Sequence, residues 1–124
     1  MTMYCSVDDI RKIFEENNTE TAIVISDAAI IAIIIDVDGE IDAALKRRYI
    51  TPFTDKPQLI TTISKLKSTA RAMREVQRGS NGALVKPEVM EHYEKKGEAL
   101  LEDLRTGRLE IAGSRRLQMS ATTH

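Results

Sequence analysis

The sequence contains few of the residues from which cross-linked or chemically active proteins are built. It has one cysteine and two histidines among 124 residues, and it has no tryptophan. A single cysteine, Cys5, excludes an internal disulfide and a zinc site made of several thiolates. His92 and His124 are too few for a metal site made of several imidazoles. We therefore expect no metal and no cofactor.

Aromatic side chains and net charge are also scarce. Aromatic residues make up 4% of the chain and apolar residues 42%, so the core must consist mainly of aliphatic side chains and methionine, which suits packed helices. The net charge of −1 provides no overall attraction to nucleic acid or to an anionic membrane. The most apolar segment, Thr21–Ile35, is shorter than the roughly 20 apolar residues of a membrane span. We expect this segment to belong to the core of one domain.

No pattern typical of catalysis is present. Nothing in the local sequence gives Cys5 the low thiol pKa that a nucleophile needs. The acidic run Asp36–Glu40 has its glycine at the wrong position for a calcium loop, so we interpret it as ordinary charge on a helix surface. Asp38 and Asp42 share a helical face but lack the Glu-x-x-His partners of a di-metal bundle. The sequence predicts a protein that is not an enzyme, with a helical-bundle enzyme as the least favoured alternative.

Capping residues and apolar periodicity predict the first two helices. Ser6, followed by acidic residues, indicates a short helix over 7–15. Ser26 is a second cap. The preceding segment, 20–25, is either a brief extended piece or a loop that covers the core, and we favour the loop. Apolar residues then recur at spacings that only a helix places on one side, namely Ile30, Ile34, Val37, Ile41 and Leu45.

The first turns of this second helix carry more isoleucine than one face can bury. Ile31, Ile33 and Ile35 fall outside the main stripe. An apolar surface this wide must be covered on several sides. Either the core of the same chain or a neighbouring subunit is expected to cover it.

Proline and glycine delimit two further helices. Pro57 is well placed to begin the third, which ends at Gly79. Pro87 opens the fourth, and Gly107 is its expected C-terminal cap. The predicted fold class is therefore all-α: a small four-helix domain over residues 1–106, followed by an extended C-terminal tail over residues 107–124.

The tail differs in pattern from the rest of the chain. Arg108–Ile111 alternates polar and apolar residues, and residues 112–124 are small, polar and basic without a helical period. An alternating segment has no strand partner inside an all-helical domain. We expect it to have no core to join, and either to be disordered alone or to pair with a sheet edge of another chain.

Two stripes of opposite charge flank the apolar faces of the third and fourth helices. The cations Lys67, Arg71, Arg74 and Arg78 and the acids Glu91, Glu94, Glu98 and Glu102 recur at spacings of three and four. Such stripes set the pairing of helices within one chain or between copies. Two ordinary solvated faces, or cations that bind DNA phosphates, remain as alternative interpretations.

Short strings along the chain point to a family. They are Tyr4 with Val7–Ile10, Glu40–Asp42, Arg48–Phe53, Tyr93–Lys96 and Leu104–Leu109. With the order of the helices, they resemble the small proteins of Mu-like prophages that form a domain family of unknown function. More broadly, they are similar to the helical head-tail connector proteins of tailed phages.

The resemblance implies a structural role in the phage neck. Such a protein is a head-completion adaptor that forms a homo-oligomeric ring, a dodecamer, under the portal protein and also meets other neck and tail proteins. It resides in the virion after assembly in the host cytoplasm, without a membrane. Its tail docks on the portal protein. Non-specific contact of the tail with packaged DNA is a further possibility. The tail residues that would make the portal contact are Arg108, Leu109, Ile111, Arg115, Arg116 and Leu117.

A small helical DNA-binding regulatory protein is the alternative function. Short helices and a basic tail are compatible with a helix-turn-helix. The third helix is too long for that motif, and the net charge is near zero. The adaptor is therefore the favoured interpretation.

Overall fold

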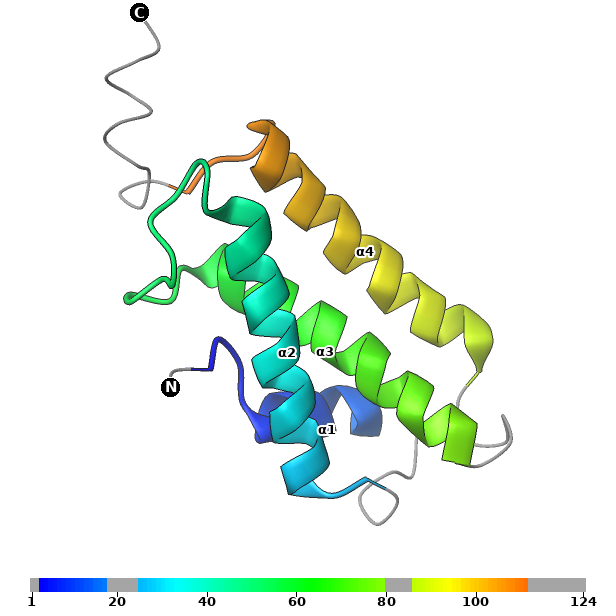
Figure 1. The fold of residues 1–124 in the computed structure, drawn as a ribbon. Helices are drawn as coiled ribbons and strands as arrows, with labels where there is room; N and C mark the ends of the chain where they lie inside the picture. The colour runs from blue at the N-terminus through cyan, green and yellow to red at the C-terminus, as the bar shows by residue number, and fades with distance from the viewer. Residues whose placement is uncertain (1–2, 18–24, 80–85, 112–124) are drawn as a thin grey trace, which may run out of the picture.

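The protein is an all-α domain, as the sequence predicts. The computed structural model describes residues 3–17, 25–79 and 86–111. It contains the helices α1 (Val7–Glu16), α2 (Asp27–Leu45), α3 (Gln58–Gly79) and α4 (Pro87–Thr106), shown in Figure 1. The expected loop over 20–25 lies outside the described residues except for Ile25. Ile25 itself is buried and belongs to the core.

Helix α3 lies at the centre of the domain and contacts the other three helices. In Figure 1, α2 crosses in front of α3, and α4 runs along its side. Small side chains let the neighbouring backbones approach α3, and several of them are fully or almost fully buried, namely Ser64, Ser68, Thr69, Ala70 and Ala72. The polar groups along α3 therefore face the interior of the protein.

The predicted caps are present at the helix ends. The Ser6 hydroxyl accepts a hydrogen bond of 3.1 Å from the Asp9 N–H, and the Asp9 carboxylate accepts one of 3.0 Å from the Ser6 N–H. The Ser26 hydroxyl caps α2 by accepting a single hydrogen bond of 3.1 Å from the Ala29 N–H. Gly107 ends α4 in the left-handed conformation at φ 87°, which favours glycine.

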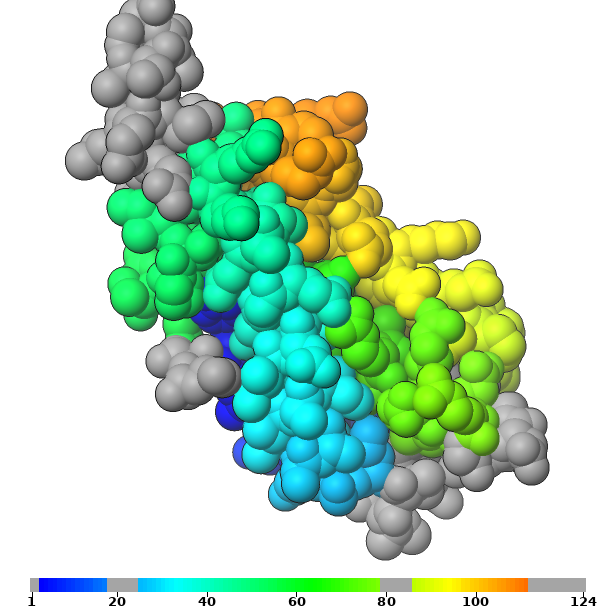
Figure 2. All heavy atoms as spheres, in the orientation of Figure 1, coloured from blue at the N-terminus to red at the C-terminus, as the bar shows by residue number. Residues whose placement is uncertain are grey.

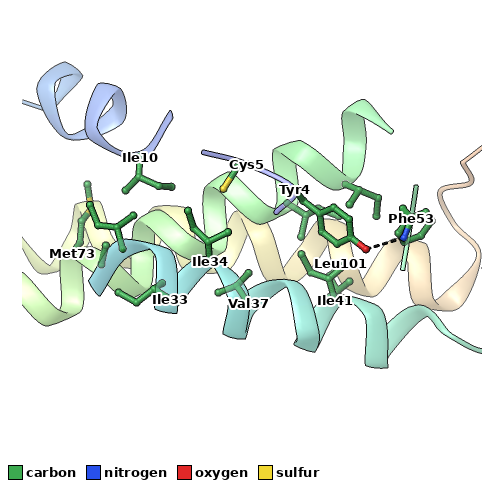
Figure 3. Packing of buried hydrophobic residues seen from close by; sticks show 14 of the residues in the cluster. Tyr4, Cys5, Ile10, Ile33, Ile34, Val37, Ile41, Phe53, Met73 and Leu101 are labelled. Carbon is green, nitrogen blue, oxygen red and sulfur yellow. Dashed lines mark hydrogen bonds between the residues drawn. The ribbon is translucent and has the colours of Figure 1, made fainter. Parts of the chain in front are cut away.

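The core follows the predicted apolar stripe of α2. Its five residues Ile30, Ile34, Val37, Ile41 and Leu45 are each 0% exposed. They pack against α1, α3 and α4, as Figure 3 shows for part of the cluster. Burying one such side chain contributes about 1.5–3 kcal/mol, so this stripe is the main stabilising feature of α2.

Three of the five aromatic side chains gather at one end of the domain. The ring of Phe53 lies 6.1 Å from that of Tyr4 and 5.9 Å from that of Tyr49. The Tyr4 hydroxyl also accepts a hydrogen bond of 2.8 Å from the Phe53 N–H, drawn in Figure 3. We call Tyr4, Tyr49 and Phe53 the aromatic cluster. It ties the N-terminal segment to the loop between α2 and α3.

Candidate functional site

Most of the cationic stripe on α3 is neutralised within the same chain. Lys67 is 7% exposed and forms an ion pair with Glu98 of α4, and its amine lies 4.0 Å from the carboxylate of Glu40 on α2. Arg71 binds both oxygens of Glu40, at 2.6 and 3.0 Å. Arg74 pairs with Glu94 of α4. These contacts join α3 to two neighbouring helices.

The other residues of the two stripes lie on the surface. Arg78 pairs with Glu75 at 3.2 Å, and Glu102 pairs with Arg105 at 2.6 Å, each within its own helix. Glu91 is exposed. The stripes thus combine contacts between helices of one chain with solvent-exposed pairs, and the exposed pairs contribute little to stability.

Glu40 of α2 belongs to neither charged stripe, yet it pairs with a cation of the α3 stripe. The hydrogen bond from Arg71 is the largest cause that holds the pKa of Glu40 below its usual value, and the nearby charges of Arg71 and Lys67 add to it. Its contribution to stability is present above the ordinary carboxyl pKa and is lost as the pH falls through the lowered one. Glu40 therefore links α2 to the cations of α3.

The acidic run of α2 differs from the expected surface charge at one position. Asp38 is 6% exposed. Its carboxylate accepts hydrogen bonds from the Tyr4 N–H at 2.8 Å and from the Ser64 hydroxyl at 2.7 Å. Burial raises the pKa of Asp38, although both hydrogen bonds act in the opposite direction. The interpretation of this run as ordinary surface charge is therefore wrong for Asp38.

Asp42, one turn further along α2, also binds the N-terminal segment. Its carboxylate accepts a hydrogen bond of 2.6 Å from the Tyr4 hydroxyl. Asp38 and Asp42 do lie on the same face of α2, as predicted, and both carboxylates accept hydrogen bonds from Tyr4. Among residues 3–17, 25–79 and 86–111, no three histidine, cysteine or acidic side chains are grouped to hold a metal ion.

Cys5 and His92 lie in different surroundings. Cys5 is buried, and burial raises the pKa of its thiol to about 11, so the thiol stays protonated near neutral pH. The Cys5 sulfur lies 3.2 Å from the Ser64 hydroxyl oxygen, whose single proton is donated to Asp38. His92 is exposed beside the ring of Tyr93. His124 lies outside the described residues.

The start of the predicted tail packs on the domain. Ile111 is 8% exposed, and its N–H donates a hydrogen bond of 3.1 Å to the Tyr49 hydroxyl. Leu109 is partly buried against the same core. This differs from the expectation that the segment after Gly107 has no core to join, because the aromatic cluster supplies an apolar surface beside the end of α4.

The remaining tail residues divide between the surface and the undescribed end. Arg108 is exposed and lies 3.5 Å from Asp103. Arg115, Arg116 and Leu117 lie outside the described residues. The helical domain therefore extends at least to Ile111, and the boundary at Gly107 falls inside it.

Apolar side chains remain uncovered on α2 and on the loop that follows it. Ile31 and Ile35 are each 36% exposed, and Ile50 is 59% exposed. Ile33, the third isoleucine outside the main stripe, is 9% exposed and belongs to the core. The core of the same chain thus covers part of the isoleucine-rich end, and Ile31 and Ile35 remain partly open.

A groove of about 570 Å³ adjoins Ile35. Gly39, Asp38 and Asp42 of α2 form one side, and Pro52, Phe53 and Thr54 of the following loop form the other. Figure 2 shows the loop beside α2 on this face. Sequence reasoning misses the groove because it depends on how the loop folds back. The proline-marked turn was the one available signal.

A search for membrane-spanning helices and two comparisons of the sequence with known proteins complete the description. None of the helices within the described ranges is long and apolar enough to cross a membrane. A search of curated proteins finds no match to the sequence. The family model described as "Bacteriophage Mu, Gp36" matches residues 4–123, nearly the whole chain. The protein therefore belongs to the bacteriophage Mu Gp36 family.

Proposed function

We propose that the protein is a structural, non-catalytic head-tail adaptor of a tailed phage. It forms a ring under the portal protein and contacts the portal through its C-terminal segment. The observation that carries the proposal is that a member of a phage Mu family leaves apolar side chains of α2 and its following loop exposed to water. A protein of the virion is consistent with this membership.

The uncovered apolar surface suits contact between subunits. Ile31 and Ile35 lie one turn apart on the same side of α2, and Ile35 borders the groove beside Phe53. Apolar side chains at the centre of an interface, surrounded by charged ones, are the usual arrangement between protein chains. A ring places one surface of each copy against a different surface of the next.

The ion pairs of α3 weigh against the alternative of a DNA-binding regulator. Such a protein needs cations that are free to meet phosphates. Lys67, Arg71 and Arg74 are instead engaged by carboxylates of the same chain.

The portal contact in this proposal is made by Arg108 and by residues 112–124, which include Arg115, Arg116 and Leu117.

Co-purification with the portal protein of the same phage tests the proposal. The full-length chain is expected to form a large cyclic complex with the portal, measured by native mass spectrometry and electron microscopy. A chain that ends at Ile111 is expected to lose that complex while it keeps its helical circular dichroism. The cut is made after Ile111 because residues 107–111 are part of the folded domain.

A matched control keeps the tail and changes a distant charge. Lys95→Ala alters an exposed residue of α4 and is expected to bind the portal as the unchanged protein does. A full-length protein that remains monomeric and ignores the portal would contradict the proposal. Equal portal binding by the shortened chain would contradict the role of the tail.

A further inference from the structure

We propose that the groove between α2 and the loop after it is the binding site for the C-terminal segment of the same chain, residues 112–124. This contact belongs to the free subunit. It is separate from portal docking, and the experiment below is done without a portal.

Gly39 is the first observation that points to an occupant. A glycine inside a helix costs about 1 kcal/mol relative to alanine. A Cβ atom at Gly39 would meet nothing within 4 Å, so no atom of the described residues fills the space that the absent side chain leaves. Glycine at such a position allows another chain segment to approach the helix backbone closely. Gly39 lines the groove.

The place where the described chain ends is the second observation. Ile111 is held to Tyr49 by a hydrogen bond of 3.1 Å, and the ring of Tyr49 lies 5.9 Å from that of Phe53. Phe53 is itself a wall of the groove. In Figure 1 the chain leaves the end of α4 and runs toward this loop. The described chain thus ends two side-chain contacts away from a wall of the groove, and such a short tether gives a local concentration of about millimolar.

The composition of the segment matches the groove. Residues 112–124 contain Arg115 and Arg116 and no acidic residue. The groove is lined by Asp38 and Asp42 among apolar side chains. Asp42 is only partly buried, and the Tyr4 hydroxyl binds its Oδ1, so a guanidinium from the segment would meet the other carboxylate oxygen. Leu117 and Met119 are the large apolar residues of the segment, and they suit the surface formed by Ile35, Pro52 and Phe53.

Disulfide trapping tests the contact directly. In the full-length protein, Thr54→Cys at the groove is combined with Leu117→Cys in the segment. Under dilute oxidising conditions we expect a disulfide within one chain, formed about tenfold faster than with the control pair Lys95→Cys and Leu117→Cys. Native Cys5 is buried with a raised thiol pKa, and the single variant Leu117→Cys measures any bond that it forms.

A groove-filling variant makes the test specific. Gly39→Leu introduces a side chain into open space on a helix, so the fold should persist. In the pair with Thr54→Cys, this change is expected to slow trapping about tenfold, to the level of the control pair. Trapping that equals the control pair, that joins two chains, or that Gly39→Leu leaves unchanged would overturn the proposal.

Discussion

Asp38 shows how one buried carboxylate connects three parts of the chain. It accepts a hydrogen bond from the Tyr4 N–H, which comes before α1, and another from the Ser64 hydroxyl on α3. The Tyr4 hydroxyl then reaches Asp42 and the Phe53 N–H. The positions of the N-terminal segment, α2 and α3 therefore depend on a small set of directed bonds in addition to apolar packing.

Replacing Asp38 with alanine should destabilise the fold. The change leaves the Tyr4 N–H and the Ser64 hydroxyl buried without their acceptor, which costs about 2–4 kcal/mol. Urea unfolding measures the loss. Asp36→Ala, at an exposed position of the same helix, is the control and should change the free energy of unfolding by no more than about 0.5 kcal/mol. Equal effects of the two changes would show that the network contributes nothing.

The pH dependence of the same residue has a defined sign. Because burial raises the pKa of Asp38 in the folded protein, the folded state holds this proton more tightly than the unfolded state. The stability gained from this protonation is fully present below the ordinary pKa of 3.8. It is lost as the pH rises through the raised pKa that Asp38 has in the folded protein. The stability of the unchanged protein relative to Asp38→Asn should therefore increase on acidification. A difference that decreases would contradict this sign.

Helices α3 and α4 pack closely at Gly97. A Cβ atom there would lie 2.8 Å from Cγ of Lys67 and 3.3 Å from Cβ of Leu66. Lys67 is buried and pairs with Glu98, so its side chain has little freedom to move aside. The absence of a side chain at Gly97 thus allows the charged pairs and the apolar contacts of the two helices to form together.

Alanine at two glycines should have opposite effects on stability. Gly97→Ala forces α3 and α4 apart and is expected to cost about 1–3 kcal/mol. Gly39→Ala meets open space and should stabilise the fold by up to about 1 kcal/mol, through helix propensity. Both are compared by thermal unfolding in the chain that ends at Ile111, which excludes any effect of the tail. Shifts of the same sign would contradict the packing argument.

The sequence predicts the helices well because their signals are local. Ser6, Ser26, Pro87 and Gly107 mark helix ends through their own backbone or side-chain chemistry, and the α2 stripe needs only a period. The missed features depend on residues far apart. Asp38 meets partners 34 and 26 residues away, and Ile111 meets Tyr49 across 62 residues. No local pattern encodes such pairs, so the groove and the true start of the tail emerge only from the fold.

At the scale of the whole molecule, the large apolar side chains that remain exposed to water lie on α2 and on the loop that follows it. Ile31, Ile35 and Ile50 are the large apolar side chains exposed within the described ranges. The paired cations of α3 lie against Glu40 of α2 and against Glu94 and Glu98 of α4. Within the described ranges, α2 and its following loop therefore carry the apolar surface that the proposed assembly would use.

Ile31→Glu should separate assembly from folding. Ile31 is partly exposed, so the change is expected to alter the free energy of unfolding by about 1 kcal/mol or less. A charge there should abolish the large complex with the portal, measured by light scattering after size-exclusion chromatography. Ala99→Glu, at an exposed position of α4, is the matched control and should assemble normally. Assembly that survives Ile31→Glu would remove this side of α2 from the interface.

The bond between Ile111 and Tyr49 also has a mechanical meaning. A load applied to the last residues of the chain reaches Ile111 first and is passed through Tyr49 to the ring of Phe53 and then to Tyr4. Tension from the C-terminus is therefore received where the N-terminal segment is also anchored, so α4 does not unravel turn by turn. In the adaptor role proposed above, such an anchorage would keep the helices in shape while the C-terminal segment is held by a partner.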